Sequence, residues 1–156
     1  MSDGKRLVGV GAVLRKGEMV LVQDHVKSGC WTIPVGKAES GETYLEAITR
    51  ELKEELNLNV QSGRLRLEKE QYCEGVGATV LHVVYDIEVS NLEELTNLEP
   101  EKHREVRWMS IGELKLKKLT DTSKLWLGAL KGGLRPSFFF TPPLLFYGSI
   151  LPIRDY

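Results

Sequence analysis

The sequence predicts an α/β fold, an α/β/α sandwich in which two helices cover opposite faces of a mixed β-sheet. Apolar runs typical of β-strands recur along the chain and surround two amphipathic helical segments. Each such helix carries an apolar stripe that must be buried, so two helices need two faces of the sheet. A length of 156 residues fits a single domain with one core, and we expect residues 1–156 to form it.

The strands are expected where apolar and β-branched residues cluster between turn signals. Lys16-Gly17-Glu18 interrupts the first apolar run like a hairpin turn, and residues 24–29 form a polar loop. A short extended piece at 31–34 then leads into a stretch that carries glycines, 35–42. We expect strands over the following ranges: 6–14, 19–22, 64–72, 79–89 and 105–109.

The clearest local pattern predicts a helix from about Tyr44 to Leu56. Leucine and isoleucine recur in this segment at helical spacing, and Thr43 followed by Glu46 is typical of a capping box. Asn57 follows the last leucine of the pattern, and asparagine tolerates the left-handed conformation that closes a helix. A second helix is expected over residues 123–130, stopped by two glycines.

The composition excludes several classes of protein. A net charge of −1, with 42% apolar and 28% charged residues, indicates a soluble globular protein that does not bind long nucleic acid. The N-terminal stretch mixes charges and glycines with apolar residues, which is typical of neither a signal peptide nor a spanning helix. We therefore expect a cytoplasmic protein without membrane contact, in which Cys30 and Cys73 are free thiols.

Three glutamates on the first predicted helix are candidates for metal binding. Glu51, Glu54 and Glu55 lie within one arc of the helix, because residues three and four apart share a face. Their mutual repulsion becomes tolerable when a hard divalent cation lies among them. Taken alone, however, the string Glu-Leu-Lys-Glu-Glu-Leu is also common on plain solvated helices.

The residues around these glutamates carry a longer, spaced motif. It resembles the box of the Nudix hydrolase family, G-x5-E-x7-R-E-U-x-E-E-x-G-U, in which U is an aliphatic residue. Asn57 stands where the family has its last glycine, and Trp31 to Gly36 is similar to the family's W-x-x-P-x-G lead-in. The resemblance covers at least residues 6–110 and implies a Nudix-type fold. The matched positions are Gly36, Glu42, Arg50, Glu51, Leu52, Glu54, Glu55 and Leu58.

The resemblance implies a role for each matched polar residue. Glu51, Glu54, Glu55 and the backbone carbonyl of Gly36 would bind Mg²⁺, with Mn²⁺ as an alternative. The catalytic candidates are Glu54, Glu51 and Arg50, because a glutamate or a metal-bound hydroxide would activate the attacking water and Arg50 would orient the carboxylates. Glu42 would hold the loop or the arginine.

A second, shorter resemblance bears on the substrate. The E-P-E-K string that begins at Glu99 is similar to a subset of the family that acts on nucleoside triphosphates. It implies that Trp126 stacks on or walls off a base, with helix packing as the alternative, and that Glu99 or Glu101 adds a metal ligand or a base. The substrate-binding candidates are Trp126, Glu101 and Trp31.

Taken together, these resemblances imply a Mg²⁺-dependent Nudix pyrophosphohydrolase that converts a nucleoside triphosphate to a nucleoside monophosphate and pyrophosphate. A nucleoside diphosphate sugar or a dinucleotide polyphosphate is the alternative substrate. A non-catalytic Nudix-fold module that binds nucleotides is a third hypothesis, which the intact carboxylates disfavour. The expected partner is a small nucleotide. We expect the apolar C-terminal extension, residues 134–156, to pack on its own domain or on a sister subunit in a homodimer, with lining of the substrate pocket as the alternative.

Overall fold

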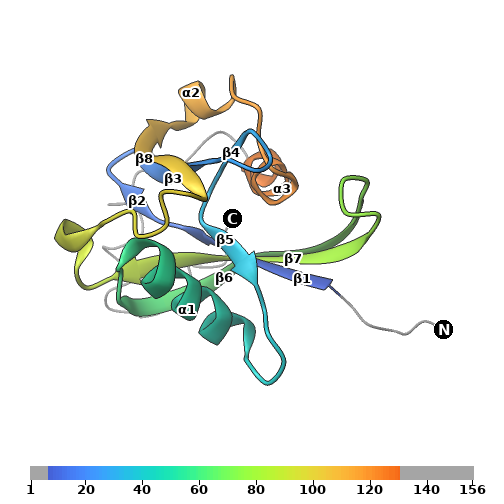
Figure 1. The fold of residues 1–156 in the computed structure, drawn as a ribbon, viewed down its shortest axis with the longest axis horizontal. Coiled ribbons are helices and arrows are strands. Elements are labelled where there is room, and N and C mark those ends of the chain that lie inside the picture. Colours follow the sequence, from blue (N-terminus) through green and yellow to red (C-terminus); the bar gives the residue numbers. More distant parts are fainter. Residues whose placement is uncertain (1–6, 131–156) are drawn as a thin grey trace.

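The structure is a computed structural model that describes residues 7–130, and the apolar extension expected at 134–156 lies outside the described residues. The described part alternates strands with three α-helices and one 3₁₀ turn (Figure 1). The strands are β1 Leu7–Val13, β2 Arg15–Lys16, β3 Met19–His25, β4 Cys30–Thr32, β5 Val35–Lys37, β6 Val60–Cys73, β7 Ala78–Val89 and β8 His103–Ser110. The helices are α1 Tyr44–Leu56, α2 Ile111–Leu114 and α3 Asp121–Ala129, and the 3₁₀ turn η1 is Leu92–Glu94.

The described strands form two four-stranded sheets, where the sequence predicted a single mixed sheet. The first has the order β5-β1-β7-β6 and is mixed, because β1 and β7 are parallel while the other neighbours are antiparallel. In the second, β3 pairs with β2, β4 and β8. Only Leu14 separates β1 from β2, so the chain crosses between the sheets at a point that no sequence pattern marks.

The two faces of the strands are covered by different helices, as the sequence predicted. Along β1, Val10 and Ala12 pack in the core cluster that contains the apolar stripe of α1, whereas Val13 packs in the cluster that contains Trp126 of α3. The same alternation occurs in β7, where Val83 belongs to the first cluster and Val84 to the second. The strands therefore lie between α1 on one side and α3 on the other (Figure 1).

Helix α1 forms as predicted. Thr43 accepts a hydrogen bond from the backbone N–H of Glu46, and the Glu46 side chain accepts one from the N–H of Thr43, which completes the capping box. Ile48, Leu52 and Leu56 are fully buried, so the apolar stripe fixes which face of the helix meets the strands. The free thiols are also confirmed, since Cys30 and Cys73 are both unpaired.

The C-terminal helical segment is longer and more broken than predicted. A short helix, α2, starts at Ser110, whose hydroxyl accepts a hydrogen bond from the N–H of Glu113. Helix α3 begins at Asp121, two residues before the predicted start. Within residues 7–130, no helix has the length and apolar run that a membrane crossing requires.

Asn57 closes α1 in the left-handed conformation, with φ at 62°, and its N–H donates to the carbonyls of Leu52 and Lys53. Replacing Asn57 with alanine should lower the free energy of unfolding by about 1 kcal/mol, because a Cβ with no polar group disfavours positive φ. Replacing it with glycine should change that energy by less than about 0.5 kcal/mol. Urea denaturation of both variants measures the difference, and equal destabilisation by the two would contradict this account.

Candidate functional site

The site is built on the inward edge of α1, where Glu51 and Glu55 lie one turn apart. The side chain of Glu51 is 16% exposed and residue Glu55 is 6% exposed, whereas the side chain of Glu54 is 53% exposed. Two of the three predicted ligands therefore point into the protein, and the third lies at its surface. The shared arc predicted from the helix period holds for Glu51 and Glu55 and only loosely for Glu54.

Glu55 is a buried acid with polar neighbours. The amide Nε2 of Gln23 donates to Glu55 Oε1 at 3.4 Å, and Glu55 also shares a hydrogen bond with the carboxylate of Glu51. Burial, followed by the hydrogen bond with Glu51 and its charge, raises the pKa of Glu55 to about 8. The protein therefore holds together two carboxylates that can both ionise only with a nearby positive charge.

Gly36, in β5, lies directly against Glu51. A Cβ on Gly36 would overlap the carboxylate carbon of Glu51 and would lie 2.5 Å from its Oε2. A side chain at this position would displace the carboxylate of Glu51, so glycine is the residue that lets Glu51 approach the backbone this closely. The antiparallel pairing of Gly36 with Val10 holds the strand in this position.

Arg50 joins the loop before α1 to the helix itself. Its guanidinium donates to Glu42 at 2.6 and 3.0 Å and to the carbonyl of Lys37 at 3.0 Å. It also donates to Glu51 at 3.1 Å and to Glu54 at 3.5 Å. The hydrogen bonds from Arg50 lower the pKa of Glu42 to about 2, so this carboxylate stays charged at neutral pH.

The loop after η1 brings a third carboxylate toward the pair. The N–H of Leu98 donates to the carbonyl of Glu55 at 2.9 Å, which ties the loop to the end of α1. Glu99 lies close enough to raise the pKa of Glu55, and its own Oε1 is 3.4 Å from Lys102 Nζ. Glu101, a predicted substrate contact, is exposed on the same loop.

The two predicted tryptophans lie in different environments. Trp126 is fully buried beside Ile33 and Met109, which favours the packing alternative over the prediction that it stacks on a base. The reason is that α3 is short and Trp126 is the largest apolar group on its inward face. Trp31 is half-buried, with the guanidinium of Arg107 4.9 Å from its ring centre.

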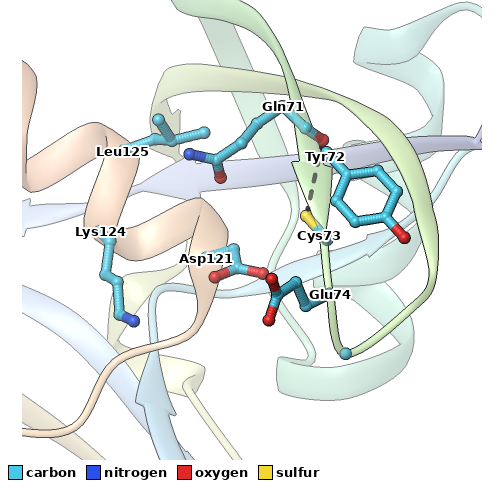
Figure 2. Close-up of a pocket in the computed structure, with 8 residues that line it drawn as sticks. Gln71, Tyr72, Cys73, Glu74, Asp121, Lys124 and Leu125 are labelled. Atoms are coloured by element: carbon cyan, nitrogen blue, oxygen red, sulfur yellow. Dashed lines mark hydrogen bonds between the residues drawn. The ribbon is translucent and has the colours of Figure 1, made fainter.

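A pocket that no sequence pattern predicted lies between the β6–β7 hairpin and α3 (Figure 2). It has a volume of about 490 Å³, and one wall carries Asp121 and Lys124 from α3. Behind it, His82 binds the hydroxyl of Thr122 at 2.8 Å and the thiol of Cys73 at 3.6 Å. The hairpin side is lined by Gln71, Tyr72, Cys73, Glu74 and Gly75.

Sequence reasoning also missed Gln23 and the pairing of two histidines. Gln23 directly follows the apolar run Met19 to Val22, and the end of that run was the only feature of the sequence that marked this position. His25 and His103, far apart in the sequence, are brought together by β3 and β8, which place their rings 5.8 Å apart. Strand register, which is not local in sequence, produces both contacts.

The residues of this site fit a hard divalent cation better than a soft one. Glu51, Glu55 and the backbone of Gly36 offer oxygen atoms alone, and the buried pair needs a compensating positive charge. Across residues 7–130, no three His, Cys, Asp or Glu side chains lie close enough to hold a metal ion as they stand. Glu51 and Glu55, with the backbone of Gly36 beside Glu51, are the oxygen-bearing groups that the fold brings together here.

Comparison with known proteins agrees with the motif. The model of the family described as "NUDIX domain" matches residues 5–129. A putative 8-oxo-dGTP diphosphatase 2 of Mycobacterium tuberculosis is 44% identical over 59 residues, which are 35% of this chain and 41% of that protein. The matched stretches span 17% to 41% of the length of the curated relatives.

Solved structures show the same fold. A MutT NUDIX hydrolase from Burkholderia pseudomallei superposes with a TM-score of 0.73 at 24% identity, covering 81% of this chain and 99% of that one. A UDP-X diphosphatase superposes with a TM-score of 0.67 at 17% identity, covering 82% of this chain and 62% of that one. At these identities the likeness establishes the mixed α/β architecture.

The raised pKa of Glu55 gives the metal-free protein a pH dependence. The pKa of Glu55 in the folded protein, about 8, lies above the pKa of an unfolded glutamate. The contribution of Glu55 to the free energy of unfolding is therefore fully present below about pH 4.5 and is lost as pH rises through about 8. The free energy of unfolding should fall by on the order of 1 to 3 kcal/mol over this range. Urea unfolding in a chelator measures it, and Glu55→Gln should flatten the curve. A parent and a variant with parallel curves would contradict the assignment.

Proposed function

Because this chain belongs to the Nudix family, we propose that it is a Mg²⁺-dependent pyrophosphohydrolase that converts a nucleoside triphosphate to a nucleoside monophosphate and pyrophosphate. One observation carries the proposal: Glu55 is a buried carboxylate that shares a hydrogen bond with Glu51, and Glu51 in turn lies against the backbone of Gly36. A fold gains nothing from burying such a pair unless a cation joins it.

Each residue of the site has a separate task in this proposal. Glu51, Glu55 and the carbonyl of Gly36 would hold the ion, with Mn²⁺ as an alternative to Mg²⁺. When bound, the ion would neutralise phosphate charge and lower the pKa of a water molecule. Arg50 donates to Glu51 and Glu54 and so fixes the positions of both carboxylates.

Glu54 is the side chain best placed to accept the proton of the attacking water. It is more than half exposed, so it can meet a substrate that arrives from solvent, and its contact with Arg50 orients it. Water forms a bond to phosphorus while the anhydride P–O bond breaks. The proton moves to Glu54, and pyrophosphate leaves with the electron pair.

The pocket beside α3 supports the choice of a nucleotide substrate. Its rim combines a carboxylate, an amide and an ammonium group in Asp121, Gln71 and Lys124, and these groups complement the polar edge of a base. A relative named for 8-oxo-dGTP favours a triphosphate, whereas the structural neighbour named for UDP-X favours the alternative, a nucleoside diphosphate sugar. We place the triphosphate first because the chain also carries the Glu99 string. Location in the cytoplasm and assembly as a homodimer remain predictions.

The reaction is tested on a panel of nucleoside triphosphates, sugar nucleotides and dinucleotide polyphosphates, with and without Mg²⁺. We expect pyrophosphate release from a triphosphate, and a fall in kcat of about 100-fold for Glu51→Gln and for Glu55→Gln, because each removes a charged ligand. Glu88→Gln, an exposed glutamate on β7, is the matched control and should keep full activity.

Two outcomes would change the assignment. Release of a sugar phosphate without turnover of any triphosphate would move the substrate to the sugar-nucleotide class. Full hydrolysis after exhaustive chelation, or by both glutamine variants, would refute the metal-dependent reaction itself.

The pocket is tested separately through Asp121. Replacing Asp121 with asparagine keeps the size of the side chain but replaces one acceptor with a donor. For the best nucleotide of the panel, kcat/KM should fall about tenfold, while hydrolysis of inorganic tripolyphosphate should not change. Equal losses on both substrates would show that Asp121 acts on the fold and not on the base.

A further inference from the structure

Gln23 is a fully buried polar residue in an otherwise apolar part of β3. It shows no exposed surface, and the residues before it, Leu21 and Val22, belong to the two core clusters. A glutamine in such a position usually satisfies both ends of its amide, because an unpaired buried polar atom destabilises the fold. Gln23 satisfies one end: its Oε1 is buried and has no hydrogen-bond partner.

The satisfied end meets the carboxylate pair. Nε2 of Gln23 donates to Oε1 of Glu55 at 3.4 Å, a long bond that leaves the amide loosely engaged. Oε1 of the same amide is buried and has no hydrogen-bond partner among the described residues. Glu55 also shares a hydrogen bond with Glu51, so the Gln23 amide and the Glu51 carboxylate both contact this one acid.

The backbone of Gln23 is held on both edges of its strand. It is opposite Thr32 of β4 on one side and opposite Val106 of β8 on the other. A side chain that projects from such a doubly paired residue has little freedom to follow Glu55 if that carboxylate moves.

We propose that Gln23 is a positioning residue for the ion site: it holds the Glu55 carboxylate turned toward Glu51, with its own carbonyl oxygen kept as an unused acceptor beside the pair. This inference rests on the proposed metal-dependent function. The unpartnered oxygen supports it, because a residue with a purely structural role would be replaced at no loss by an apolar side chain of the same size. Buried polar groups that weaken a fold locally are expected at functional sites.

The test uses the full chain with Gln23 replaced by methionine, which has a similar length and no polar end. Because the variant removes a buried unsatisfied oxygen, its Tm without metal should equal or exceed that of the parent. Its Kd for Mn²⁺, measured by calorimetry on chelator-treated protein without nucleotide, should weaken about tenfold. Its kcat should fall by a similar factor while KM stays within twofold, as expected for an effect on the ion and not on the base.

Gln61→Met is the matched control, because Gln61 is an exposed glutamine on β6. It should leave Tm, Kd and kcat unchanged. A double-mutant cycle with Glu55→Gln separates positioning from a general effect on the fold. If Gln23 acts through Glu55, then Gln23→Met should weaken Mn²⁺ binding by less than twofold in the Glu55→Gln background.

The results separate this inference from the proposed function. A Gln23→Met protein that folds and binds Mn²⁺ within twofold of the parent overturns the positioning role, even if the parent is an active hydrolase. A tenfold loss of Mn²⁺ affinity that is fully additive with the effect of Glu55→Gln also overturns the positioning role. A parent that binds no Mn²⁺ overturns the proposed function first. If the methionine variant does not fold, Gln23→Asn, which withdraws the amide by one methylene, is judged by the same limits.

Discussion

The constraint on which the structure depends is the burial of two like charges on one edge of a helix. Glu51 and Glu55 project from successive turns of α1, where Arg50 binds Glu51 and the buried Glu55 lies against Gln23 and Glu51. The close approach of Glu51 to β5 depends on the absence of a side chain at Gly36, and the Gln23 amide contacts Glu55. The residues that contact this pair are therefore restricted to those that leave room for the carboxylates or bind them.

Burial of apolar side chains in the core stabilises this arrangement. Ile48, Leu52 and Leu56 are fully buried, so the orientation of α1 about its own axis is fixed by packing, and the glutamates on the adjacent edge follow. The end of the helix is fixed as well. The N–H groups of Thr96 and Leu98 donate to the carbonyls of Leu56 and Glu55, which satisfies acceptors at the terminus and brings the Glu99 loop to the site.

What the sequence could predict was set by the range of the interactions involved. The bounds of α1, its capping box and its closure at Asn57 follow from residues a few positions apart, and all were confirmed. Gln23, the His25–His103 pair and the pocket at Asp121 depend on strand register and on packing between distant segments. The sequence could not decide between the two roles of Trp126, because an aromatic residue on a helix has the same pattern whether it faces a ligand or the core.

Arg50 shows how the site can accept a cation without losing its shape. The guanidinium binds Glu42 through two hydrogen bonds and the carbonyl of Lys37 through a third, and none of these involves the buried pair. Because Glu42 stays ionised down to about pH 2, this anchor persists whatever the charge on Glu51. Arg50 can therefore release or keep Glu51 as the charge there changes, while the loop that carries Gly36 remains joined to the helix.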